Sequence, residues 1–399
     1  MQYRFNARSP AFDADTINET IKRALASAGL DTTAGPLHNV TETIRSALAS
    51  AGLADTPTAP RSTEPVIDVE ARVVGTADAD GEARPSNRPS TDGIGAPGSF
   101  ETHEFSNHAG TRSYKLYVPA GAHESSLPVV VMLHGCTQSP DDFAAGTRMN
   151  RLADEHGFLV VYPEQPARAN TSKCWNWFKQ QDQLRDAGEP SLVAGIVREV
   201  ATRHDADLRR MFVAGLSAGA AMAVVLGETY PELFAGVGAH SGLPYGSAHD
   251  IPSAMAAMKG GRSGLARAQG MPSAAAASPR KAVQPVPTIV FHGDRDHTVQ
   301  QTNGSEIVKQ AKDAYLAQAG DVPLTSSTQN GKAPGGRDYS RTVYSDAEGH
   351  AQIESWVLHG AGHAWSGGDA RGSYTDRTGP DASAEMVRFF LALPRAGSA

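Results

Sequence analysis

The segment RRMFVAGLSAGAAMAVVLGETY, residues 209–230, most constrains how this chain can fold. An apolar strand pattern runs directly into Gly215-x-Ser217-x-Gly219, and a helix pattern follows it. A serine flanked by glycines between a strand and a helix is typical of a nucleophile elbow, whose strained turn projects the hydroxyl from a sheet edge. The alternative interpretation is a serine that only caps the helix. The strand–turn–helix context favours Ser217 as a nucleophile.

Strand and helix patterns alternate on both sides of this segment. Apolar runs predict strands at residues 128–133, 158–162, 210–214, 237–239, 288–291 and 354–358. Helical patterns occur at residues 139–157, 192–204, 218–230 and 382–393. Short strands near residues 114–118 are expected to form an antiparallel edge. Buried strands alternating with helices predict an α/β protein with a mostly parallel sheet covered by helices on both faces.

Low-complexity segments divide the chain. Residues 1–56 contain a repeat, INETIKRALASAGL and VTETIRSALASAGL, which predicts two short amphipathic helices. They are interpreted as a helical hairpin that rests on the main domain or is half-ordered. The alternative is a docking element for a hydrophobic surface, such as a polymer granule or a partner. Residues 57–100 have a linker composition. Residues 101–395 are expected to form the main domain, with a flexible insertion at residues 258–287.

Charge and hydropathy narrow the class of partner. The net charge is −7, and no basic patch with interleaved aromatic residues occurs, which argues against nucleic acid. No apolar run approaches the length of a membrane span. The N-terminus lacks the apolar core and cleavage site of a signal peptide, which favours a cytoplasmic protein. Two cysteines are too few for a typical structural zinc site, and we expect neither a metal nor an organic cofactor.

A serine nucleophile needs an acid and a base, which follow it in that chain order in this fold class. The strand pattern TIVF ends in HGDRDHTV, where the Gly-x-x-Asp-x-x-Val spacing selects Asp296. Asp294 is the competing acid, with loop capping as its alternative role. After the last predicted strand, a glycine-rich loop offers His363 as the base. His359, nearer the strand end, is the competing candidate and is interpreted as structural.

Two backbone amides are candidates for an oxyanion hole. Ala218 follows the nucleophile directly, and Cys136 lies in the loop HGCT after an early strand. The Cys136 thiol is an alternative nucleophile, although no His or Asn pattern points to it. We also hold the hypothesis that Cys136 and Cys174 form a disulfide that pins this loop; two free thiols are the other state.

Tryptophans cluster around these motifs. Trp175 and Trp177 lie in CWNWF, and Trp365 follows the predicted base by two residues. We predict that they line an ester-binding cleft. The alternative is that their rings fill core volume, as most aromatic rings do.

Six motifs in order resemble the poly(3-hydroxybutyrate) depolymerase family of esterases. They are PVVVMLHGCTQSPDDFAAGTRMNRLADEHGFLVVYPEQ, CWNWF, AGLSAGAAMA, HSGLPYG, TIVFHGDRDHTV and HGAGHAWSGG, and the resemblance covers roughly residues 105–393. It implies an α/β-hydrolase fold, the triad Ser217, Asp296 and His363, and an oxyanion hole from Cys136 and Ala218. The N-terminal repeat and the linker lie outside it.

The resemblance also implies a reaction. Members hydrolyse ester bonds in poly- or oligo(3-hydroxyalkanoates), and relatives cleave feruloyl or acetyl esters on plant polysaccharides. We therefore expect a serine esterase that acts on a polyester or a small ester through an acyl-enzyme. A feruloyl- or acetyl-type carbohydrate esterase is one alternative, and a catalytically silent protein that binds polymer or granules is another. Many members are secreted, which sets the resemblance against the cytoplasmic expectation from the N-terminus.

Overall fold

The computed structural model describes residues 98–120, 126–260, 285–320 and 322–394. The repeat predicted at residues 1–56, nearly all of the linker and most of the insertion predicted at residues 258–287 lie outside these described residues. The organisation proposed for those segments stays a prediction.

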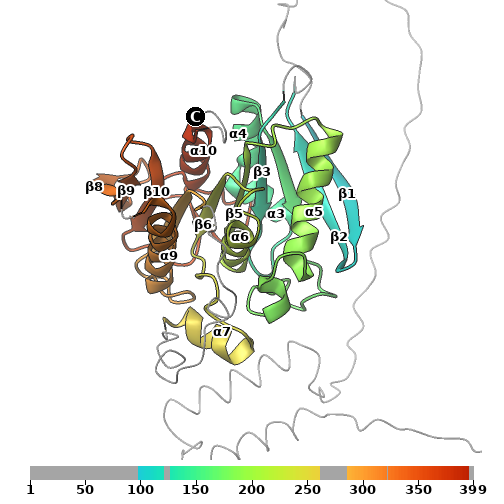
Figure 1. Ribbon diagram of the computed structural model, residues 1–399, viewed down its shortest axis with the longest axis horizontal. Coiled ribbons are helices and arrows are strands. Elements are labelled where there is room, and N and C mark those ends of the chain that lie inside the picture. The colour runs from blue at the N-terminus through green and yellow to red at the C-terminus, as the bar shows by residue number, and fades with distance from the viewer. Residues whose placement is uncertain (1–97, 121–125, 261–284, 321, 395–399) are drawn as a thin grey trace, which may run out of the picture. The chain divides into compact units, whose positions relative to one another are not determined.

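A ten-stranded sheet forms the centre of the described domain, in the order β1-β2-β4-β3-β5-β6-β7-β10-β9-β8 (Figure 1). The six strands from β4 to β10 run parallel, and an antiparallel pair flanks them at each end. The strands are β1 Ser99–Asn107, β2 Gly110–Val118, β3 Val129–Leu133, β4 Leu159–Pro163, β5 Met211–Leu216, β6 Gly236–His240, β7 Thr288–Gly293, β8 Thr325–Lys332, β9 Asp338–Ser345 and β10 Ala351–Leu358. The predicted mostly parallel sheet and its antiparallel edge near residues 114–118 are confirmed.

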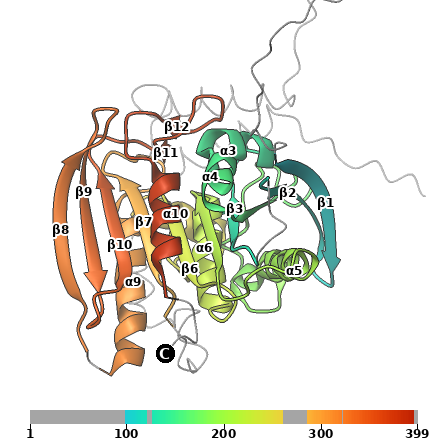
Figure 2. The same cartoon turned by 90° about the horizontal axis from the view of Figure 1, so that it is seen from above.

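Helices cover both faces of this sheet, as Figure 2 shows from above. One face carries α5 Gly188–Arg203, α6 Ala218–Thr229, α7 Ile251–Met258 and α9 Thr302–Ala319. The other face carries α3 Pro140–Thr147, α4 Met149–His156 and α10 Ala382–Ala392. A short 3-10 helix, η1 Gln180–Gln183, and the two-residue strands β11 Trp365–Ser366 and β12 Thr375–Asp376 complete the described elements.

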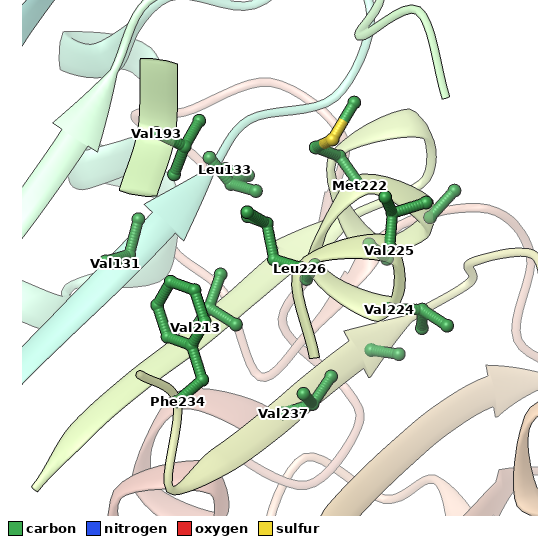
Figure 3. Packing of buried hydrophobic residues seen from close by; sticks show 14 of the residues in the cluster. Val131, Leu133, Val193, Val213, Met222, Val224, Val225, Leu226, Phe234 and Val237 are labelled. Atoms are coloured by element: carbon green, nitrogen blue, oxygen red, sulfur yellow. The ribbon is translucent and has the colours of Figure 1, made fainter. Parts of the chain in front are cut away.

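Alternation along the strands feeds two separate hydrophobic cores. In β3, Val131 and Leu133 pack into the core under α5 and α6, whereas Val130 and Met132 pack toward α4 and α10. Figure 3 shows the first core, with Leu226 of α6 among the buried side chains of β3 and β5. Burying each such side chain contributes roughly 1.5–3 kcal/mol. The segment that carries Ser217 therefore lies between two packed layers, which hold its backbone in place.

The helical stretch predicted at residues 139–157 is two helices rather than one. Arg148 ends α3 in the left-handed conformation, with φ 56°, and its amide donates to the Ala144 carbonyl. The Arg148 guanidinium binds the Gly367 carbonyl at 2.7 Å and the Asp381 carboxylate at 2.8 Å. These contacts tie the break to the C-terminal part of the domain. Because these contacts join residues far apart in the chain, the helical periodicity of residues 139–157 could not predict the break at Arg148.

Candidate active site

Ser217 occupies a strained turn between β5 and α6. Its backbone has φ 57° and ψ −118°, a region that residues with a side chain rarely adopt. The surrounding glycines allow strand and helix to approach. A Cβ on Gly215 would lie 2.4 Å from the Gly219 carbonyl carbon, and one on Gly219 would lie 2.1 Å from the Leu133 oxygen. The Gly-x-Ser-x-Gly spacing thus has a steric cause, and it leaves the Ser217 side chain half-buried at the sheet edge.

Asp296 and His363 form a short hydrogen bond. Oδ2 of Asp296 lies 2.7 Å from Nδ1 of His363, and Oδ1 accepts the amides of Thr298 and Val299 at 2.9 Å each. Burial raises the pKa of Asp296, but the hydrogen bond and charge of His363 and the Val299 amide hold it below its usual value. The charged carboxylate keeps the imidazole proton on Nδ1. Nε2 of His363 is then left to act as a base.

The topology brings these three residues to one edge. Ser217 follows β5, Asp296 follows β7 and His363 follows β10, and all three strands run parallel in one sheet. β6 separates β5 from β7, and β10 pairs directly with β7. Because the carboxyl ends of parallel strands share an edge, the loops that follow them lie together, where ligands bind in open α/β sheets. The competing candidates Asp294 and His359 lie on the same two loops and bond to each other at 3.0 Å.

The loop after β3 is anchored to the segment that contains Cys174. A disulfide joins Cys136 to Cys174, and the Thr137 amide donates to the Ser172 carbonyl at 2.7 Å. The Trp175 indole N–H donates to the His134 carbonyl at 3.1 Å. Among the described residues, the backbone amides of Cys136 and of Ala218, the first residue of α6, bond to no protein acceptor. Both can therefore donate to an oxyanion.

The three tryptophans predicted to line a cleft are buried. Trp175 has 0% of its surface exposed, Trp365 has 1% and Trp177 has 6%. Trp175 and Trp177 belong to the core under α5, and Trp365 packs edge-on against Phe143 in the other core. This burial favours the alternative that the rings fill core volume. A direct role in substrate binding stays a prediction, and the structure gives it no support from exposed surface.

Two of the buried histidines near the site were not predicted to have a role. Burial lowers the pKa of His240 to about 3 and that of His134 to about 4, so both are neutral near pH 7. Nε2 of His240 accepts the Ser366 amide at 3.0 Å, and its carbonyl accepts the Ser217 amide at 2.9 Å. Nε2 of His134 accepts the Gln165 amide at 3.1 Å. Both histidines hold backbone, and only their place inside HGCT and HSGLPYG could have drawn attention to them.

A buried carboxylate supports the Cys174 segment from below. Glu189 accepts hydrogen bonds from Gln165 at 2.5 Å and from Asn176 at 2.8 Å and 2.6 Å. Gln165 also donates to the Cys174 carbonyl at 2.9 Å. Beside it, buried Asp182 accepts the Glu189 amide at 2.7 Å. Burial and the neighbouring Glu189 charge raise the pKa of Asp182 to about 6.

Other features of the described surface lie away from Ser217. A mainly apolar hollow runs between β1 and α5, lined by Phe105 and Gly195 among others. Its lining does not include Ser217, Asp296 or His363, so it is not the candidate active site. In the described ranges, no group of His, Cys, Asp and Glu side chains is arranged to hold a metal ion. Nor does that part of the chain contain a helix long and apolar enough to cross a membrane.

Sequence comparison shows which known proteins this chain is similar to. A family model described as esterase PHB depolymerase matches residues 112–333. Poly(3-hydroxyalkanoate) depolymerase C of Paucimonas lemoignei is 33% identical over 264 residues, which are 66% of this chain and 61% of that protein. The probable acetylxylan esterase A of Aspergillus fumigatus is 34% identical over 146 residues, 36% of this chain and 38% of that protein. The chain thus spans less than two thirds of the length of these curated relatives.

Among solved structures, the acetyl xylan esterase from Aspergillus awamori aligns with a TM-score of 0.57 at 21% identity. The alignment covers 74% of this chain and 100% of that chain. At this level of identity the likeness concerns the fold. It agrees with the α/β-hydrolase fold expected from the sequence.

Proposed function

This chain belongs to the esterase PHB depolymerase family, and we propose that it is a serine esterase that hydrolyses ester bonds of poly- or oligo(3-hydroxyalkanoates). The observation that carries the proposal is the 2.7 Å bond between Asp296 and His363 on the sheet edge where Ser217 occupies a strained turn. A charged acid, an oriented imidazole and a projecting serine are the three parts that acyl transfer requires.

In the proposed reaction, His363 takes the proton of Ser217 at Nε2 as Oγ attacks the ester carbonyl. The Cys136 and Ala218 amides hold the resulting oxyanion; both are unbonded among the described residues, which supports this role. The tetrahedral intermediate collapses, the alcohol leaves with the proton from His363, and an acyl-serine remains. Water then gives its proton to His363 and attacks the acyl group, which releases the acid and restores Ser217. Asp296 stabilises the imidazolium in both halves.

The test of this chemistry is hydrolysis of a short-chain nitrophenyl ester by the full chain and by Ser217→Ala. We expect the variant to lose at least about 10⁴-fold in kcat while its thermal unfolding curve stays close to that of the wild type. Wild-type turnover that survives Ser217→Ala would overturn the proposed nucleophile. A wild type without turnover on any ester would favour the silent, polymer-binding alternative.

An acetyl- or feruloyl-type carbohydrate esterase is the second candidate function. It is favoured by the sequence similarity to acetylxylan esterases. A panel of 3-hydroxybutyrate oligomers, polymer, acetylated xylan and feruloyl esters separates the two candidates. Higher kcat/KM on the oligomers than on the carbohydrate esters supports the first proposal, and the reverse order supports the second.

We further propose that the repeat at residues 1–56 recruits the enzyme to a polymer granule. Support comes from its two amphipathic patterns, which carry few cationic residues and so do not suit an anionic membrane surface. Deletion of these residues should leave turnover of a soluble ester nearly unchanged and weaken sedimentation with polymer particles. Unchanged sedimentation would contradict the proposal.

A further inference from the structure

A second carboxylate–imidazole pair lies on the two loops that carry Asp296 and His363. Asp294 precedes Asp296 by two residues, and His359 precedes His363 by four. The loops follow β7 and β10, which are neighbouring parallel strands that pair up to their last residues. The loop that carries Asp296 (the acid loop) and the loop that carries His363 (the base loop) therefore leave the sheet side by side. Asp294 and His359 lie nearer to the strand ends.

The Asp294 carboxylate bridges these loops. Oδ1 accepts the Gly360 amide at 2.7 Å, and Oδ2 lies 3.0 Å from Nδ1 of His359. Partial burial raises the pKa of Asp294, but the hydrogen bonds from His359 and Gly360 hold it below its usual value. A charged carboxylate on the acid loop thus binds the base loop at two points.

Backbone contacts run alongside this bridge. The Arg295 amide donates to the Ala361 carbonyl at 3.0 Å. The chains pass so closely that a Cβ on Gly293 would lie 2.3 Å from the same carbonyl oxygen. The Asp294 side chain therefore secures a contact that the main chain has already brought together.

The base loop needs such support. Its sequence is Gly360-Ala361-Gly362-His363, and Gly360 has φ 72°. A Cβ on Gly362 would meet no atom within 4 Å, so packing does not confine that residue. Glycines have more backbone freedom than other residues. A displacement of about 1 Å in a catalytic group can cost about 10²-fold in rate.

We propose that Asp294 and His359 are positioning residues, which fix the base loop against the acid loop and so hold His363 on Asp296. The inference rests on the proposed function, in which His363 is the base for Ser217. It assigns a role in catalysis to the two residues that competed with the triad in sequence, although neither bonds to the Asp296 or His363 side chain.

Ser340 gives the second pair the look of a complete triad. Its Oγ lies 2.9 Å from Nε2 of His359 and donates to Asn330 at 2.7 Å. However, Ser340 lies within β9, between β8 and β10, and its backbone is part of the sheet. A strand interior offers no helix start whose amides could hold an oxyanion. We therefore interpret Ser340 as a hydrogen-bond partner of His359 and not as a nucleophile.

The experiment compares Asp294→Ala with Asp294→Asn on a soluble aryl ester. Asp294→Ala should lower kcat by about 10- to 100-fold with KM changed less than twofold, because ester binding does not require the bridge. Asp294→Asn keeps an acceptor for the Gly360 amide and should recover most of the loss. His359→Ala removes one of the two contacts and should fall between them. Proton NMR should show the low-field Nδ1 proton of His363 in the wild type and Asp294→Asn, and a broadened one in Asp294→Ala.

Asp346→Ala is the matched control. Asp346 also accepts an amide, that of His350 at 2.7 Å, and pairs with that histidine's ring at 3.5 Å, but at the other end of β9 and β10. It should leave kcat and the low-field proton unchanged. Wild-type kcat with an intact low-field proton in Asp294→Ala would overturn the positioning role, as would a loss that Asp294→Asn does not recover.

Ser217→Ala separates this inference from the proposed function. Turnover that survives Ser217→Ala but is lost in Ser340→Ala would make Ser340 the nucleophile and overturn both. If turnover survives both in Ser217→Ala and in Ser340→Ala, only the proposed nucleophile is wrong. The low-field proton then still reports whether Asp294 holds His363 on Asp296.

Discussion

Oδ2 of Asp296 lies 2.7 Å from Nδ1 of His363, on a carboxylate whose other oxygen is bound by two loop amides. The Asp296 carboxylate is therefore held by its own loop through one oxygen, and it orients the imidazole through the other. This arrangement specifies the tautomer that the proposed reaction needs, with the proton on Nδ1 and the lone pair on Nε2.

Asp296→Asn should lower kcat by about 10⁴-fold, because an amide can donate to Nδ1 and stabilise the wrong tautomer. The measurement is kcat on a nitrophenyl ester, with Asp294→Asn as the matched control on the same loop. The control should keep at least a tenth of wild-type activity. If Asp294→Asn is the inactive variant and Asp296→Asn the active one, the two aspartates have exchanged roles.

Gly219→Ala should lower the free energy of unfolding by about 3 kcal/mol, because its Cβ would lie 2.1 Å from the Leu133 oxygen and 2.6 Å from the His134 oxygen. Both are backbone atoms that cannot rotate away. Gly362→Ala is the control, since no atom lies within 4 Å of its added Cβ. Chemical denaturation measures both variants, and equal midpoints would contradict the steric account of the turn.

The double variant Cys136→Ser, Cys174→Ser should lose roughly 3–4 kcal/mol of stability, the amount expected from opening a loop of 38 residues. Its kcat should fall as well, since the disulfide anchors the loop that presents the Cys136 amide. Denaturant midpoints and ester turnover are the two readouts. Two titratable thiols in the denatured, unreduced wild type would show that the bond is absent.

Asp182→Asn should stabilise the protein at pH 8 and have little effect at pH 3.5. Burial and the Glu189 charge raise the folded-state pKa of Asp182 to about 6, from the ordinary value of 3.8. The folded chain therefore holds a proton that the unfolded chain loses between these values, and stability falls as pH rises through this window. The gain at pH 8 is at most about 3 kcal/mol. Denaturation at the two pH values measures it, and a gain independent of pH would contradict the assignment.

Much of the fold could be predicted because its central strands are continuous apolar runs. β3 reads VVVML and β4 reads LVVYP, and every residue of both is buried. The β8–β9 hairpin could not be predicted, because β8 lacks such an apolar run. β8 reads TSSTQNGK and is almost wholly exposed, so its place in the sheet comes from backbone pairing with β9 and not from side-chain burial.

The candidate active site, like the fold, could be predicted only in part from the sequence. The order of Ser217, Asp296 and His363 follows from the chain topology. It could be predicted because each residue lies in a loop directly after an apolar strand pattern. The contacts that hold the site could not be predicted, because they join distant segments: Trp175 with His134, Asp294 with Gly360, Glu189 with Gln165. The tryptophans show the limit most clearly, since composition alone could not separate a cleft wall from a core.

The strained backbone of Ser217 has a consequence for how this sequence drifts over generations. With φ 57° and ψ −118°, the position would suit glycine better than any residue with a side chain, and the misfit costs on the order of 1–3 kcal/mol. Random substitution followed by selection for stability alone would therefore tend to replace the serine. A lineage that had abandoned catalysis would gain stability by replacing Ser217, because the stability of the fold alone does not favour a serine at this position.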